Sequence, residues 1–176
     1  LPIDTSVYNF ITKHFISDTL TPIMRVITQF GGTILMIVWA IASLVLITNK
    51  RIAVSVVSNL VLIALLNNIL KLIVRRARPT GFRLITETGY SFPSGHSMVS
   101  MAFYGYLIYL IHKNVRNTKL RWTLMTGFGL LIFIIGMSRI YLGVHYTSDV
   151  FAGFLFSLGY LVVYIKMTDP IVFQKK

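Results

Sequence analysis

Five strongly apolar stretches, separated by short polar segments, make up most of the chain. They cover about residues 33–48, 52–70, 97–111, 122–137 and 150–165. A free-standing membrane span needs about 20 apolar residues, so several of these stretches are short for one. The shortfall fits a bundle whose helix ends extend into polar loops that the protein itself buries. The pattern therefore predicts an all-α, polytopic transmembrane helix bundle, with five spans within residues 31–170.

Residues 1–30 are mixed in polarity, with prolines and aspartates between short apolar clusters. We expect one or two short helices there, outside the hydrocarbon layer and at the interface. Buried helices of a soluble protein are the alternative, but five such segments would leave little amphipathic surface to face water. The chain has no internal repeat or second domain, and residues 1–176 are therefore predicted to form a single membrane-embedded domain.

Composition supports the membrane interpretation. Of the 176 residues, 55% are hydrophobic and 12% charged, with 17 basic residues against 5 acidic ones and a net charge of +12. Such an apolar chain is not disordered. Nucleic-acid binders surround a modest core with charge, so the composition argues against a nucleic-acid partner. The absence of cysteine excludes disulfides, thiolate chemistry and cysteine-bound metals.

The loop charges predict an orientation. If all five stretches span, residues 50–51, residues 113–121 and the carboxyl-terminal tail share one side, which the positive-inside rule makes cytoplasmic. Residues 1–30, 71–96 and 138–149 then lie outside. The loop 71–96 nevertheless carries five cations against Glu87 alone. This conflict disappears if several of those cations belong to a binding site. An odd number of spans with an outside amino terminus also leads us to expect a further span before Leu1.

The predicted outer segments contain almost every residue suited to chemistry. Three cations, two histidines, one carboxylate and a Ser-Gly pair converge there: Lys71, Arg78, Ser94, Gly95, His96, Arg139, His145 and Asp149. Each fits a phosphate ester as substrate. Arginine forks match phosphate oxygens, and lysine adds a compact charge. Ser94 and Gly95 stand where a helix begins, so unpaired backbone N–H groups can face an anion.

The two histidines suggest acid–base and nucleophilic roles. His145 and Asp149 are four positions apart, a spacing that suits one helical face or a turn. A carboxylate on one imidazole nitrogen leaves the other nitrogen free to attack phosphorus. His96 can then protonate the departing oxygen. A metal site is not expected, because three adjacent cations would repel the ion. No cofactor is expected either.

The remaining cations and histidines receive simpler interpretations. We expect Arg75, Arg76 and Arg83 to extend to the lipid headgroups. His14 and His112, where no other charge converges, are interpreted as hydrogen-bonded interface residues.

These motifs resemble the signature of a known family. The parts are Lys71, six residues, Arg78-Pro79; Pro93-Ser94-Gly95-His96; and Ser138-Arg139, five residues, His145, three residues, Asp149. Together they are similar to the three-part signature of the type 2 phosphatidic acid phosphatase superfamily, in its membrane, bacterial branch. The matched span is residues 71–149.

The resemblance implies a metal-independent reaction through a covalent phosphohistidine. His145 would be the nucleophile, Asp149 its orienting partner and His96 the general acid. Lys71, Arg78, Ser94, Gly95 and Arg139 would hold the phosphate. Membrane members have six spans, so the resemblance implies a first span before Leu1.

The predicted function is therefore that of a multi-pass plasma-membrane enzyme with an extracytoplasmic active site. Its substrate would be a lipid phosphate or diphosphate: phosphatidic acid, phosphatidylglycerophosphate or undecaprenyl diphosphate. Two alternatives stay open, a lipid phosphotransferase using the same site and a non-catalytic lipid-binding or carrier protein. The sequence does not decide the oligomeric state.

Overall fold

The computed structural model describes residues 2–173, and all regular secondary structure in that range is helical. The elements follow one another as α1 (Pro2–His14), α2 (Leu20–Gln29), α3 (Thr33–Leu46), α4 (Lys50–Val74), α5 (Gly95–Asn114), α6 (Thr118–Tyr141) and α7 (Thr147–Val172). The predicted helix bundle is confirmed, and of the one or two short helices expected within residues 1–30 two are present, α1 and α2.

Polar side chains mark where several helices begin. The Asn49 side chain accepts a hydrogen bond from the Arg51 amide at the start of α4, and Asn117 accepts one from the Leu120 amide at the start of α6. Capping by Asn or Ser satisfies amides that lack a partner in the first helical turn. These caps fix the ends of long helices whose apolar interiors carry no internal stop signal.

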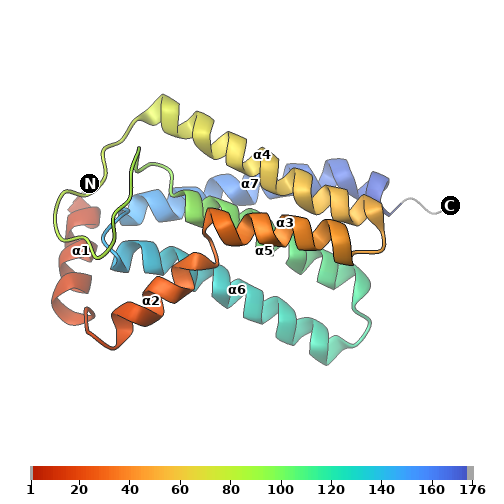
Figure 1. Ribbon diagram of the computed structural model, residues 1–176, viewed down its shortest axis with the longest axis horizontal. Helices are drawn as coiled ribbons and strands as arrows, with labels where there is room; N and C mark the ends of the chain where they lie inside the picture. The colour runs from red at the N-terminus through yellow and green to blue at the C-terminus, as the bar shows by residue number, and fades with distance from the viewer. Residues whose placement is uncertain (1, 174–176) are drawn as a thin grey trace.

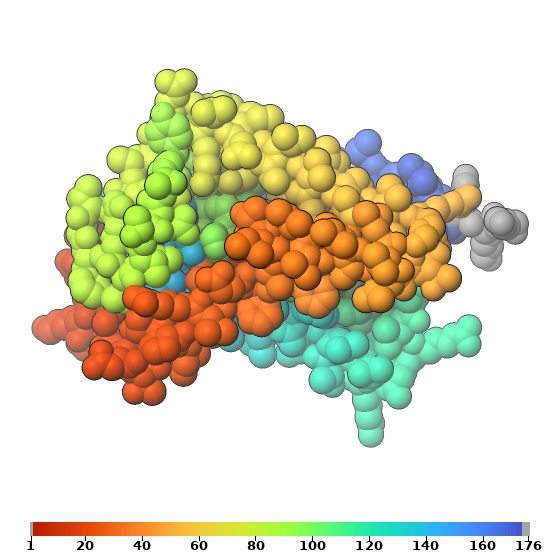
Figure 2. Space-filling view, viewed as in Figure 1, coloured from red at the N-terminus to blue at the C-terminus, as the bar shows by residue number. Residues whose placement is uncertain are grey.

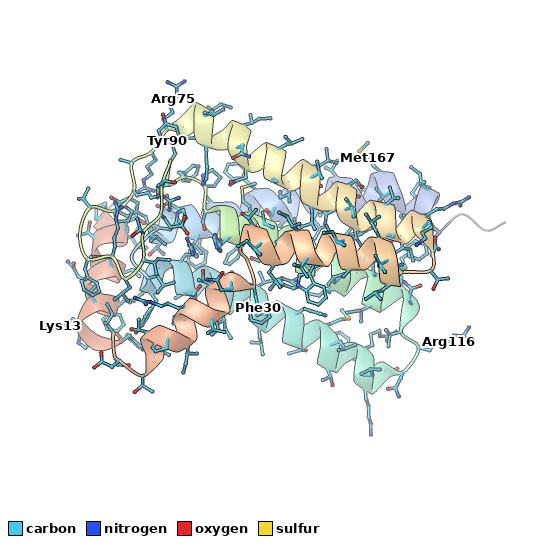
Figure 3. The ribbon with its side chains drawn as sticks, viewed as in Figure 1. Lys13, Phe30, Arg75, Tyr90, Arg116 and Met167 are labelled. Atoms are coloured by element: carbon cyan, nitrogen blue, oxygen red, sulfur yellow. The ribbon has the colours of Figure 1, made fainter. Side chains whose placement is uncertain are left out.

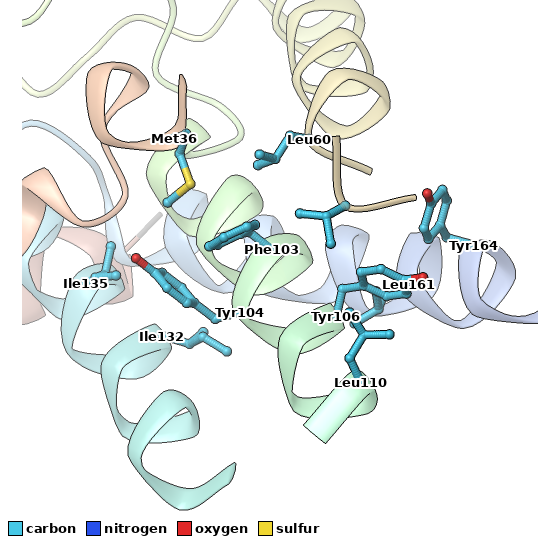
Figure 4. Close-up of a cluster of buried hydrophobic side chains, with 11 residues drawn as sticks. Met36, Leu60, Phe103, Tyr104, Tyr106, Leu110, Ile132, Ile135, Leu161 and Tyr164 are labelled. Carbon is cyan, nitrogen blue, oxygen red and sulfur yellow. The ribbon is translucent and has the colours of Figure 1, made fainter. Parts of the chain in front are cut away.

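Helix α5 lies inside the bundle, in contact with α4, α6 and α7. Its aromatic side chains Phe103, Tyr104 and Tyr106 lie in the main buried cluster, together with Ile135 of α6 and Leu161 of α7 (Figure 4). Helix α3 packs against α4, α2 packs against α6, and α1 contacts α6 and α7. Figure 1 shows the long helices running roughly side by side, with α1, α2 and the loop 75–94 gathered at one end.

Within residues 2–173, three helices are long and apolar enough to cross a membrane: α4, α6 and α7. The pair α2 and α3, which is bent by 43°, adds a fourth if it is counted as one span. The five-span count is therefore not confirmed by length and composition. Helix α5 falls outside this set because it buries polar groups such as Ser97, Ser100 and Tyr106 against its neighbours. A helix surrounded by other helices needs less apolar surface of its own.

Two asparagines of α4 pair across helices, as expected for a membrane bundle. Asn59 Nδ2 donates to the Ala102 carbonyl at 2.9 Å, and Asn67 Nδ2 donates to the Pro93 carbonyl at 3.3 Å. Both side chains are buried. They anchor α4 to α5 and to the segment that precedes α5.

The loops separate into two groups at the two ends of the bundle (Figure 1). The α3–α4 and α5–α6 turns lie at the end marked by Arg116, opposite the end that holds Lys13 and Tyr90 (Figure 3). The basic segments at residues 50–51 and 113–121 therefore share one end, and the chemical motifs share the other. Which end faces the cytoplasm stays a prediction.

Candidate active site

A cavity of about 480 Å³ connects the loop 75–94 with the space between α3 and α4. Figure 2 shows the recess between that loop and α3. Six of the eight predicted site residues line the cavity: Lys71, Arg78, Gly95, His96, Arg139 and His145. The other two, Ser94 and Asp149, are fully buried outside its lining. The fold thus brings together residues that are up to 78 positions apart, from Lys71 to Asp149.

His145 lies in the turn between α6 and α7, with 2% of its side chain exposed. Its Nε2 is 3.2 Å from Nη1 of Arg78, and its Nδ1 is 3.5 Å from Oδ2 of Asp149. Arginine can only donate, so Nε2 accepts with its lone pair, and Nδ1 carries the proton and points it at the carboxylate. The pair is formed through a turn and not along a helical face, because α7 begins at Thr147.

Burial lowers the pKa of His145 to about 4, and the charges of Arg139 and Arg78 act in the same direction. The hydrogen bond with Asp149 opposes this shift. The imidazole is therefore neutral at physiological pH. A neutral imidazole with an unprotonated nitrogen is the form that a nucleophile requires.

Asp149 stands in the first turn of α7 and is fully buried. Its Oδ2 accepts from the Tyr146 amide at 2.9 Å and from the Ser91 hydroxyl. Its Oδ1 accepts from Arg76 Nη1 at 2.7 Å. Both carboxylate oxygens thus have hydrogen-bond partners. These partners orient the carboxylate so that Oδ2 faces His145.

The Arg78 guanidinium is fixed by backbone carbonyls. Its Nε donates to the Thr88 and Gly89 carbonyls, at 3.2 Å and 3.1 Å, and its Nη1 donates to the Val144 carbonyl at 3.0 Å. These bonds tie the loop 75–94 to the turn that carries His145. An arginine held in this way is oriented before any anion binds, which lowers the ordering cost of binding.

Arg139, in the last turn of α6, is 1% exposed. Its Nη1 donates to the Thr28 hydroxyl of α2 at 2.7 Å, and its Nη2 donates to Glu87 Oε1 at 2.5 Å. Its buried Nε has no hydrogen-bond partner among the residues that the structure describes. Arg139 is thus held by Thr28 and Glu87 at the cavity wall.

Glu87 lines the same cavity and lies between the two arginines. Its Oε2 is 4.0 Å from Arg78 Nη2, in addition to the shorter contact of its Oε1 with Arg139. Burial raises the pKa of Glu87, but the hydrogen bond and charge of Arg139 and the charge of Arg78 outweigh it and leave the pKa below its usual value. The carboxylate is therefore ionised and occupies the side of the arginines where an anion would bind.

The start of α5 completes the polar wall. Ser94 caps the helix, its Oγ accepting from the Ser97 amide at 3.4 Å. A side chain on Gly95 would come within 3.1 Å of Asn67 Oδ1 and 3.9 Å of Lys71 Nζ, so glycine lets α4 approach this terminus. The Ser94 hydroxyl is thus engaged in the helix cap. If this segment contacts a phosphate, the contact would come from the backbone N–H groups of residues 94–96.

Several functional contacts were not predicted from the sequence. Arg76 was expected to extend to the headgroups, which is wrong: it forms ion pairs with Asp4 and Asp149 at 2.8 Å and 2.7 Å. Thr28 and Ser91 carried no signal at all. Glu87 did carry one, because it was the only carboxylate in a loop with five cations. By contrast, the Arg75 side chain is exposed and donates to the Leu72 carbonyl within its own turn.

Beyond its polar wall the cavity is apolar. Its lining continues along α3 through Met36, Ile37 and Ala40, and along α4 through Leu60 and Ala64. The site therefore combines an anion-binding wall with a hydrocarbon-lined extension between two helices that border the lipid-exposed surface. Such a site suits an amphiphile that carries a phosphate.

The structure is a membrane-type helix bundle in which two histidines, three cations and the carboxylate of Glu87 line one cavity, with the Asp149 carboxylate directly behind His145. The chain belongs to the PAP2 superfamily, whose model matches residues 52–172. The predicted resemblance to the type 2 phosphatidic acid phosphatases is thereby confirmed.

Individual relatives agree. The chain is 37% identical over 105 residues to phosphatidylglycerophosphatase B of Bacillus subtilis, covering 57% of this chain and 49% of that protein. It is 27% identical over 161 residues to an undecaprenyl-diphosphatase of Sulfolobus acidocaldarius, covering 87% of this chain and 74% of the relative. The chain thus spans about half the length of the first relative.

Solved structures share the fold. The crystal structure of a transmembrane PAP2-type phosphatidylglycerolphosphate phosphatase from Bacillus subtilis matches with a TM-score of 0.82 and 26% identity, over 97% of this chain and 89% of that one. LpxE of Aquifex aeolicus matches with a TM-score of 0.69 and 22% identity, over 92% and 94% of the two chains. The second likeness concerns the fold alone.

Proposed function

We propose that this protein is an integral membrane phosphatase that hydrolyses the phosphomonoester or diphosphate of a lipid without a metal ion. One observation carries the proposal. His145 presents an unprotonated Nε2 beside Arg78, with Asp149 on its other nitrogen, at a cavity that continues into an apolar cleft. Nucleophile, anion-binding groups and lipid-compatible volume therefore coincide.

In the proposed first step, the His145 Nε2 lone pair attacks phosphorus. A P–N bond forms while the bond from phosphorus to the leaving oxygen breaks, and the proton on Nδ1 stays in contact with Asp149. Arg78, Arg139 and Lys71 bind the phosphate oxygens, on which negative charge is spread in the transition state. Preorganised donors in a site shielded from water are more effective there than in bulk solvent.

His96 is the proposed acid and base. It lines the cavity at the start of α5 and gives a proton to the leaving alcohol or phosphate. It then takes a proton from water, whose oxygen attacks phosphorus as the P–N bond breaks. Inorganic phosphate leaves, and His145 returns to its starting form.

The apolar extension between α3 and α4 supports a lipid as the substrate. Acyl or prenyl chains would lie along side chains such as Met36, Ile37 and Leu60 while the phosphate meets the cations. The names of two relatives suggest phosphatidylglycerophosphate or undecaprenyl diphosphate, and membership of the family adds phosphatidic acid. A site at the outer face of the plasma membrane follows from the loop charges and the positive-inside rule.

The test is phosphate release by the purified chain from short-chain phosphatidic acid, phosphatidylglycerophosphate and a polyprenyl diphosphate. We expect His145→Ala to lower the rate at least about 10³-fold on every active substrate. His112→Ala, in the last turn of α5, is the matched control and should keep the rate within about twofold. Equal rates for the two variants would overturn the proposal. Phosphate appearing on an added lipid alcohol instead of in solution would identify a phosphotransferase.

A further inference from the structure

Arg76 lies behind the proposed catalytic pair, outside the lining of the cavity. Its Nη1 donates to Asp149 Oδ1 and to the Ser148 hydroxyl, each at 2.7 Å. Its guanidinium carbon stands 4.1 Å from the centre of the Tyr146 ring. All three contacts fall within residues 146–149, immediately after His145. Arg76 therefore binds the segment that carries the Asp149 carboxylate, and it does so from outside the cavity.

Asp4 of α1 holds the other side of this arginine. Its Oδ2 accepts from Arg76 Nη2 at 2.8 Å and from the Ser148 hydroxyl at 2.8 Å, and its Oδ1 accepts from the Ser148 amide at 2.9 Å. Asp4 is 1% exposed. Burial would raise its pKa, but the hydrogen bonds from Arg76 and Ser148 bring the pKa down to about 2. A buried carboxylate with this many charged and backbone donors is a fixed anion at neutral pH.

The two carboxylate oxygens of Asp149 have different partners. Oδ1 is used by Arg76, so Oδ2 is left for the Tyr146 amide, the Ser91 hydroxyl and His145 Nδ1. Without Arg76, Oδ1 would be a buried anionic oxygen with no cation against it. Rotation of the carboxylate would then compete with its contact to the imidazole.

We propose that Arg76 and Asp4 form a positioning pair that holds Asp149 in the orientation its contact with His145 requires. The inference rests on the proposed function, because it assigns the pair a role in activating the His145 nucleophile. It makes α1 part of the catalytic apparatus, although no residue of α1 lines the cavity. Arginine suits the role because one planar group reaches two carboxylates, whereas a lysine ammonium is a single point.

The inference also fixes a direction for the pH dependence. The charged and titratable groups around His145 are Asp149 on Nδ1, Arg78 on Nε2, and Arg139, Glu87 and His96 across the cavity. Arg76 acts on the imidazole only through Asp149. Without Arg76 the contact between Asp149 and Nδ1 is loosened, and this contact raises the pKa of His145, so the pKa falls in the variant. The acid limb of the rate should then move to lower pH.

The experiment compares Arg76→Gln and Arg76→Lys with Arg75→Gln, using phosphate release from short-chain phosphatidic acid by the purified full chain. Arg75 is the adjacent arginine and is exposed, which makes it the matched control. We expect Arg76→Gln to lower kcat about 10- to 100-fold with KM within about twofold, since a misplaced catalytic group costs rate and not binding. Its acid limb should shift to lower pH, and Arg76→Lys should restore part of kcat. Arg75→Gln should match the wild type.

A second experiment uses Asp4→Asn. If the two residues act as a unit, the kcat of the double variant Asp4→Asn/Arg76→Gln should be no lower than that of Arg76→Gln alone. If the two single losses of kcat multiply in the double variant, the residues act independently and the pairing is overturned. A loss of kcat in Arg76→Gln with no shift of the acid limb would reduce Arg76 to a structural role and overturn the inference.

Two controls separate the possible failures. Thermal unfolding with and without inorganic phosphate shows whether each variant is folded with an intact anion site, and Arg76→Lys carries the test if Arg76→Gln does not fold. His145→Ala decides the proposed function independently. An inactive His145→Ala beside a fully active Arg76→Gln refutes only the positioning pair, whereas an active His145→Ala refutes the proposed reaction itself.

Discussion

We expect Glu87 to compete with an anionic substrate for the two arginines, so that its removal tightens anion binding. The carboxylate accepts from Arg139 Nη2 at 2.5 Å and lies 4.0 Å from Arg78 Nη2. A phosphate that binds Arg139 must displace or share this contact. In the variant Glu87→Gln the side chain keeps its shape and one hydrogen bond, but it loses the charge.

The size of the effect follows from the contact that is weakened. A hydrogen bond between charged groups contributes about 1.5–3 kcal/mol. Glu87 is 29% exposed, so the lower end of that range applies. About 1.4 kcal/mol corresponds to a tenfold change in an equilibrium constant. We therefore expect the inhibition constant of inorganic phosphate to fall about tenfold in Glu87→Gln.

The assay is competitive inhibition of lipid-phosphate hydrolysis by inorganic phosphate at pH 7. Asp169→Asn is the control, because this carboxylate pairs with Lys113 at 3.4 Å, at the opposite end of the bundle (Figure 1). It should leave the inhibition constant unchanged. An inhibition constant that stays the same or rises in Glu87→Gln would refute the competition. A rise would mean that Glu87 orients Arg139 for the anion.

Three further predictions concern pH, metals and the turn before His145. Because the reacting imidazole must be neutral and its pKa is about 4, the loss of kcat/KM that reports protonation of His145 should be centred near pH 4. Dialysis against EDTA should leave phosphate release unchanged, because no step of the proposed reaction uses a metal ion. Gly143→Ala should lower the melting temperature strongly, since Gly143 has φ +72° and an added Cβ would collide with the Phe82 carbonyl. Gly89→Ala, at φ +73° with nothing within 4 Å, should lose only about 1–2 kcal/mol.

A specific result would contradict each of these three predictions. An acid limb centred near 6.5 would show that burial does not depress the pKa of His145. Activity lost in EDTA and restored by a divalent ion would contradict the metal-free scheme. Equal melting temperatures for the two alanine variants would show that backbone conformation alone, and not the Phe82 carbonyl, limits the turn at Gly143.

The orientation prediction has its own test, because the chain contains no cysteine. Single cysteines placed within residues 82–90 should react with an impermeant reagent outside intact cells, and those within residues 113–119 should not. The reverse labelling would invert the predicted topology.

The sequence determined the local features of this protein. Apolar runs of helical length predicted the bundle, because in a membrane only closed backbone hydrogen bonding is tolerated. Motif spacing was equally local: Ser94 and Gly95 stand at a helix start, and His145 and Asp149 are near neighbours in the chain. These patterns predicted six residues that now line one cavity.

Tertiary structure decided which charges pair. Arg76 and Arg75 are adjacent and chemically identical, yet one joins Asp4 to Asp149 and the other faces outward. The partners of Arg76 lie 72 and 73 positions away, and Thr28 lies 111 positions from Arg139. No periodicity links such positions, because their distance depends on how α1, α2 and α7 dock against the end of the bundle. The sequence could therefore predict the groups that contact phosphate, whereas the groups that hold them in place emerge only when the helices pack.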